Sequence, residues 1–141
     1  RFSSATHRVG LIYASAVPLR AFTNHSRSPQ AHVLHTCVAE AMLVAQYFGA
    51  LREVAARKAA GACSGRVFLT PLGTGAFNNS WESIARGMSL ALEMLADSER
   101  ACLDVRVLTS RGNADERQML HQLLGKRRKL RSHQSPPGSL P

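Results

Sequence analysis

The chain is poor in the features that define several protein classes. Its three cysteines are far apart in the sequence and form no Cys-x-x-Cys pair: Cys37, Cys63 and Cys102. This spacing argues against both a disulfide framework and a zinc ribbon. Cys37 also lies near His32 and His35, but a structural zinc site needs four ligands and no second cluster is visible. We therefore expect no metal, no cofactor and an intracellular protein, whether cytoplasmic, nuclear or organellar.

Long apolar runs are also missing. No stretch approaches the roughly 20 residues that span a bilayer, and residues 1–8 lack the apolar core of a secretory signal. We expect no membrane association. With 141 residues and 45% hydrophobic content, the chain is long enough and apolar enough to bury one core.

Acidic residues are absent after Glu116, so the net charge of +9 is unevenly placed. The basic side chains beyond that point are Arg117, Lys126, Arg127, Arg128, Lys129 and Arg131. Together with the Ser/Pro-rich end, they predict a basic tail without fixed structure over residues 126–141. Such tails bind nucleic acid or acidic partners, or are simply solvated.

Strand-like and helix-like segments alternate along residues 1–125. Apolar residues at helical spacing (Leu34, Val38, Ala41, Ala45 and Phe48) predict a helix from Ala31 or His35 to about Lys58. A clearer stripe (Trp81, Ile84, Met88, Ala91 and Leu95) predicts a second helix, with Asn79 as N-cap and Glu82 completing a capping box. Three strands are expected over residues 9–17, 67–71 and 103–109, with a loop over 19–30, a break at 97–100 and a last helix over 115–124.

This alternation predicts an α/β fold with a mainly parallel sheet and helices on both of its faces. Ligands of such sheets collect at the carboxyl ends of the strands. The loop Gly73–Asn79 and the loop Ser15–Asn24 both leave the sheet at that edge. We expect Glu40 and Glu53 to be outward helix residues.

The segment between Arg66 and Ser80 carries the most chemistry. An apolar strand leads to Gly73-Thr74-Gly75, then to Ala76, Phe77 and two asparagines that start a helix. Glycines let backbone amides approach an anion closely, and a helix N-terminus favours negative charge. The pattern therefore predicts a phosphate-binding loop, and its alternative is a tight strand-to-helix turn without a ligand.

In order and spacing, three segments resemble the macrodomain family of ADP-ribose-binding proteins. They are the first strand with its proline (Leu11–Pro18), an aromatic and Ala-Leu helix (Tyr47–Ala55), and the strand with its Gly-x-Gly-Ala-Phe loop (Phe68–Asn79). The similarity covers roughly residues 9–110, the later part of such a domain, and implies a three-layer αβα fold. Residues 1–125 would form the domain.

The resemblance implies that the chain binds ADP-ribose, a related nucleotide diphosphate or an ADP-ribosylated protein. The amides of Gly73, Thr74, Gly75 and Ala76 would hold the diphosphate. Phe77 would lie against the distal ribose, and Asn78 or Asn79 would support the helix cap or a ribose hydroxyl. The residues themselves add Ser15, from the neighbouring loop, as a candidate ligand contact. Phe22 and Phe77 either form an aromatic wall over the cleft or pack in the core.

Some similar proteins are ADP-ribosyl hydrolases, but the sequence identifies no catalytic residue. The paired glutamates of the glycohydrolases are missing, as is the family's glycine-rich first loop with its Asn. The alternative function is a non-catalytic interaction protein. In that case the basic arm, Lys126–Arg131, contacts nucleic acid or an acidic partner.

Overall fold

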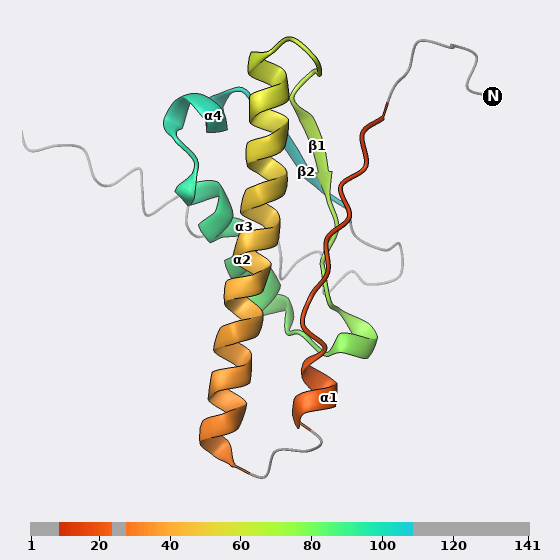
Figure 1. Cartoon of the computed structure of the whole chain (residues 1–141), viewed down its shortest axis with the longest axis vertical. Helices are drawn as coiled ribbons and strands as arrows, with labels where there is room; N and C mark the ends of the chain where they lie inside the picture. The colour runs from red at the N-terminus through yellow and green to blue at the C-terminus, as the bar shows by residue number, and fades with distance from the viewer. Residues whose placement is uncertain (1–8, 24–27, 109–141) are drawn as a thin grey trace, which may run out of the picture.

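A computed structural model describes residues 9–23 and 28–108. Helix α2 (Pro29–Ala59) runs along the long axis of the molecule, as Figure 1 shows. Pro29 occupies the first turn, where its missing N–H costs nothing, and the abundant alanines favour helix. The predicted last helix and the basic tail lie outside the described residues.

The buried face of α2 differs from the predicted one. Side chains four residues apart form the buried stripe: Ala39, Leu43, Tyr47, Leu51 and Ala55. The expected face is wrong, because Leu34 and Val38 are 61% and 48% exposed. By length and composition alone α2 could cross a membrane, although one such helix is weak grounds for a span.

Helix α3 (Trp81–Met94) packs against α2 and carries the predicted apolar stripe. Ile84, Met88 and Ala91 are at most 1% exposed. Gly87 allows a close approach of the helices, since an added Cβ would lie 3.0 Å from the Leu43 Cβ. The N-cap is Ser80, whose hydroxyl accepts from the Ser83 amide at 3.0 Å, so the predicted Asn79 cap is wrong.

The sheet described by the structure has two parallel strands, β1 (Arg66–Leu69) and β2 (Asp104–Val107), with Arg66 opposite Asp104. The two strands are joined through α3 and a short helix, α4 (Asp97–Ala101), which replaces the expected break. Alternate side chains face the core, with Val67 and Leu69 buried against α2 and α3. An α/β architecture with a parallel sheet is thus present.

The N-terminal segment is not a strand, contrary to prediction. Residues 9–18 extend beside the domain (Figure 1), and the amides of Val9 to Ala16 make no backbone hydrogen bonds with other described residues. Val9, Leu11 and Tyr13 are exposed, whereas Ala16 is buried. The expected loop then begins as a helical turn, α1 (Leu19–Thr23). The apolar composition of this segment predicted a strand, but a strand also needs a neighbouring strand with which to form backbone hydrogen bonds, and the described residues provide none.

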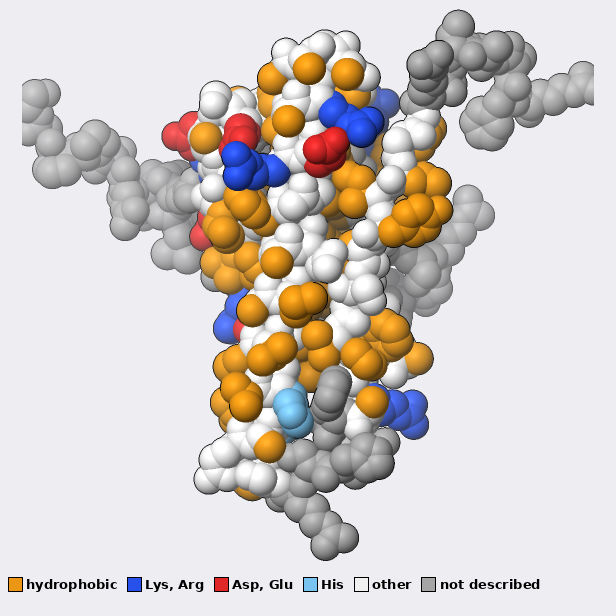
Figure 2. Space-filling model, viewed as in Figure 1, with side chains coloured by type: hydrophobic (Ala, Val, Ile, Leu, Met, Phe, Trp, Pro, Cys, Tyr) orange, Lys and Arg blue, Asp and Glu red, His pale blue; other side chains and the backbone are white. Residues whose placement is uncertain are grey.

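The exposed face of α2 carries several apolar side chains and few charges. Figure 2 shows hydrophobic side chains spread along the molecule, with one group of charged side chains where α2 ends beside α4 and a few others elsewhere on this face. At that end Arg57 pairs with Glu53, and Arg52 pairs with Glu99 at 3.7 Å. These pairs are largely solvent-exposed and contribute little to stability.

Candidate functional site

The candidate site is the loop that leads from β1 to α3. Strand pairing ends where the Leu108 amide donates to the Leu69 carbonyl at 2.8 Å. Immediately beyond, the Tyr47 hydroxyl of α2 donates to the Thr70 carbonyl and accepts from the Leu72 amide, both at 2.9 Å. Pro71 lies between Thr70 and Leu72 and has no N–H that needs a partner. The single Tyr47 hydroxyl therefore pairs the polar backbone groups on both sides of it, the Thr70 carbonyl and the Leu72 amide. The chain is thereby turned out of the sheet at a fixed place.

Tyr47 is therefore more than a packing residue. Its side chain is buried, and burial raises its pKa to about 12 against the opposing effect of the Leu72 hydrogen bond. The hydroxyl thus stays protonated near neutral pH and remains able to donate. No local pattern in the sequence signals a contact between residues 25 positions apart.

The far end of the loop is closed by Asn79. Its backbone amide donates to the Gly73 carbonyl at 3.0 Å, and its side-chain Nδ2 donates to the same carbonyl at 3.2 Å. Nδ2 also donates to the Val17 carbonyl at 2.9 Å, which ties the N-terminal segment to the loop. The Asn79 side chain is only 5% exposed. It is a structural clamp and not a helix cap.

Gly73 is required by this closure. Its φ of +82° suits glycine, and an added Cβ would lie 2.4 Å from Asn79 Nδ2 and 2.5 Å from the Ala16 Cβ. Gly75 has a φ of +67° but open space where a Cβ would go. The two glycines therefore have different roles. Gly73 leaves room for the Asn79 side chain, whereas Gly75 provides a left-handed backbone conformation in the exposed part of the loop.

Between the contacts made by Tyr47 and by Asn79, residues Gly75 to Asn78 of the loop are exposed. Residues Gly75–Phe77 form a single 3₁₀ turn, η1, ended by Asn78 in the left-handed conformation at a φ of +59°. Among the described residues, the amides of Gly75 and Ala76 donate to no acceptor. Both residues are exposed, which is compatible with an anion contacting these amides.

The structure brings most of the predicted site residues together. Gly73 through Asn79 form one loop, with Phe77 39% exposed and Asn79 buried beneath it. Ser15 is exposed and precedes Ala16, whose Cβ lies at the Gly73 backbone. Phe22 belongs to α1, which packs beside η1, but its side chain lies outside the described residues. The expected aromatic wall thus stays a prediction.

A polar cluster between α2 and α3 was not foreseen. Ser83 is buried and donates to Glu40 Oε1 at 2.8 Å, while Arg86 lies 3.6 Å from the other oxygen of the same carboxylate. Glu40 therefore bridges the helices instead of pointing outward, whereas Glu53 is exposed as expected. A carboxylate about three turns along an alanine-rich helix carries no sequence mark of such a contact.

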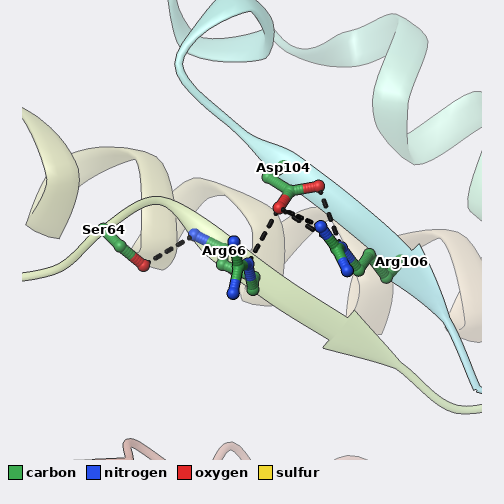
Figure 3. A network of polar contacts seen from close by, with 4 residues as sticks. All are labelled: Ser64, Arg66, Asp104 and Arg106. Carbon is green, nitrogen blue, oxygen red and sulfur yellow. Dashed lines mark hydrogen bonds and ion pairs between the residues drawn. The ribbon is translucent and has the colours of Figure 1, made fainter.

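A second cluster lies on the outer face of the sheet, at the amino ends of the strands (Figure 3). Asp104 lies between Arg66, at 2.9 Å, and Arg106, at 3.1 Å. Hydrogen bonds from Arg106 and then from Arg66 lower the pKa of its carboxyl. Because the Gly73–Asn79 loop follows the carboxyl end of β1, this cluster belongs to the opposite edge. It plays no part in the candidate site.

In the part of the chain that the structure describes, no group of three or more His, Cys, Asp or Glu side chains is placed to bind a metal ion. The carboxylates named above contact Arg or Ser side chains away from the loop. The arrangement therefore offers backbone donors and conformational rigidity.

Comparison with known proteins found no matching family model, no similar curated protein and no similar solved structure. The macrodomain resemblance therefore stays a prediction based on the residues quoted for it. The geometry of the loop is what carries the functional argument.

Proposed function

We propose that this chain binds ADP-ribose or a related nucleotide diphosphate through the loop Gly73–Asn79. The observation that carries the proposal is the pair of exposed amides at Gly75 and Ala76, which have no acceptor among the described residues. Successive backbone amides in a turn that contains left-handed residues are an arrangement that suits a phosphate oxygen. The loop also follows the carboxyl end of a parallel strand, where α/β proteins bind ligands.

The absence of acidic side chains from the loop is compatible with an anionic ligand. The loop residues Gly73 to Ser80 contain no acidic side chain, so nothing in the loop itself repels a diphosphate. The first acidic residue after it, Glu82, lies 4.0 Å from Arg86. Recognition would rest on backbone donors, with Phe77 and Asn78 as the exposed side chains nearest in sequence.

Hydrolysis of an ADP-ribosyl bond needs a general acid or a group that positions water. In the described part, Glu40 contacts Ser83 and Arg86, and Asp104 contacts two arginines on the opposite edge. None of these contacts involves the loop. The described residues therefore favour a binding module over a hydrolase.

Calorimetric titration with ADP-ribose tests the proposal. We expect saturable binding to the wild type and its loss in Ala76→Asp, which adds a negative charge at an exposed loop position. Ala62→Asp is the matched control, because Ala62 is also exposed but precedes the amino end of β1. Absence of binding at millimolar ADP-ribose, or equal binding by both variants, would contradict the proposal.

The proposal also includes the finer three-layer arrangement. Helices α2 and α3 cover one face of the sheet, and on the other face Phe68 and Leu108 are 53% and 50% exposed among the described residues. Half-exposed apolar side chains there suit a further covering layer. An experimental structure of the chain with bare solvent over this face would contradict the arrangement.

A second candidate rests on the basic residues Lys126 to Arg131, which lie outside the described residues. A run of Lys and Arg without acidic neighbours favours contact with nucleic acid or an acidic partner. Affinity for a nucleic-acid column should fall steeply with salt and disappear when the chain ends at Gly125. Unchanged retention of the shortened chain would reject this candidate.

A further inference from the structure

The loop is held at both ends by side chains that do not belong to its exposed surface. Tyr47 comes from the middle of α2 and meets the backbone on both sides of Pro71, through Thr70 and Leu72. Asn79 is buried under the loop and donates three hydrogen bonds, two to Gly73 and one to Val17. The Tyr47 hydroxyl contacts the loop backbone, and the Asn79 Oδ1 is buried without a hydrogen-bond partner among the described residues.

The two anchors control the direction of the free amides. Apart from the hydrogen bond of the Asn79 amide to Gly73, the backbone hydrogen bond inside the loop among the described residues runs from the Asn78 amide to the Gly75 carbonyl. The left-handed conformations of Gly73 and Gly75 are thus retained because the ends of the loop are fixed. A loop whose ends are released must be ordered by its ligand, which lowers affinity.

We propose that Tyr47 and Asn79 are positioning residues of the Gly73–Asn79 loop, holding the Gly75 and Ala76 amides in one direction before a ligand arrives. The identity of the ligand rests on the proposed function above, but the positioning itself does not. It follows that affinity is set partly by α2 and by the segment at Val17, remote from the exposed loop.

The high pKa of Tyr47 supports its part in this arrangement, because a protonated hydroxyl is the form that donates to Thr70. Tyr47→Phe removes that hydroxyl and keeps the buried ring, so the packing against the core is retained. Tyr13→Phe is the matched control, since Tyr13 is 91% exposed. Asn79→Asp has the same shape as asparagine but replaces the Nδ2 donor with an acceptor facing two carbonyls.

The test compares these variants by the NMR signals and hydrogen exchange of the Gly75 and Ala76 amides without ligand, and by titration with ADP-ribose. We expect Tyr47→Phe and Asn79→Asp to shift both amide signals, speed their exchange and weaken binding about tenfold, the order expected for one or two lost hydrogen bonds. Tyr13→Phe should match the wild type in every readout.

Acidification supplies a rescue that a purely structural defect would not show. Burial favours the protonated carboxyl of Asn79→Asp, which can donate again. Its loop signals should therefore move toward those of the wild type as the pH falls, while those of Tyr47→Phe should not.

Wild-type loop signals in both Tyr47→Phe and Asn79→Asp would overturn the positioning role, whatever the ligand result. Unchanged affinity in both variants would overturn it equally. Failure of the wild type to bind ADP-ribose would instead count against the proposed function, and the amide signals would still decide the positioning role. Well-dispersed signals from Leu43 and Met88 establish that each variant is folded, and if one variant does not fold, the other decides the test.

Discussion

The two faces of the β1–β2 sheet divide its eight residues between them and serve opposite purposes. On the inner face Val67 and Leu69 pack against a core whose largest members, such as Leu43 and Met88, are at most 1% exposed. On the outer face Arg66, Asp104 and Arg106 form an exposed charged cluster. Because side chains alternate along a strand, one face of the sheet contributes to the core and the other contributes charges to the surface. The candidate site uses neither face, since it is formed by the loop beyond Leu69.

The largest expected effect is on the inner side. Leu43→Ala should lower the free energy of unfolding by about 2–5 kcal/mol, because it leaves a cavity between α2 and α3. Val38→Ala on the exposed side of the same helix should change it by less than about 0.5 kcal/mol. Urea unfolding of both variants measures the difference. Equal losses would mean that α2 buries a different face.

The two glycines of the loop sharpen the distinction between its anchored and its open part. Gly73→Ala should cost about 2–4 kcal/mol, since its Cβ would strike Asn79 and Ala16 and the left-handed conformation disfavours alanine. Gly75→Ala meets no neighbour within 4 Å and should cost about 1–2 kcal/mol, from conformation alone. Thermal and urea unfolding would rank the two. The reverse order would refute the closure at Asn79.

Alkaline pH should destabilise the fold through Tyr47. Its folded pKa of about 12 exceeds the ordinary 10.0, so its contribution is present below pH 10 and lost as the pH rises toward 12. The loss should be of the order of 2 kcal/mol. Unfolding free energies of the wild type and Tyr47→Phe should therefore converge at high pH, with Tyr13→Phe following the wild type. Parallel curves would show that the hydroxyl ionises freely.

The smallest effect is expected on the outer face. The pKa of Asp104 is lowered, so its contribution is present above the ordinary carboxylate pKa and is lost as the pH falls through the folded value. Asp104→Asn should cause a slight destabilisation at neutral pH that shrinks in acid and in high salt. A loss comparable to that of Leu43→Ala would mean that the ion pairs of Asp104 with Arg66 and Arg106 are shielded from solvent.

Much of the fold could be read from local patterns. Helices α2 and α3 and strands β1 and β2 were predicted, because long periodic runs and short apolar alternation are strong local signals. The buried face of α2 was not, since an alanine-rich helix offers several apolar stripes. Its partner α3 selects the stripe through Leu43.

The candidate site shows the same division. The glycine loop was visible in the sequence because Gly73 and Gly75 mark backbone conformations that other residues avoid. Its anchors were not visible, since Tyr47 and Val17 are distant in sequence. The N-cap was misplaced by one residue, because Asn79 and Ser80 are equally good caps and burial of Asn79 against Val17 decides between them.

By itself, the sequence determined that α2, α3, β1, β2 and a glycine turn are present and approximately where they lie, because those depend on propensity and spacing within a few residues. Tertiary structure alone decided which face of α2 is buried, that residues 9–17 form no strand with the other described residues, and that Tyr47 and Asn79 contact the two ends of the loop. These outcomes depend on hydrogen bonds and packing between segments far apart in the chain, and no local pattern specifies such partners.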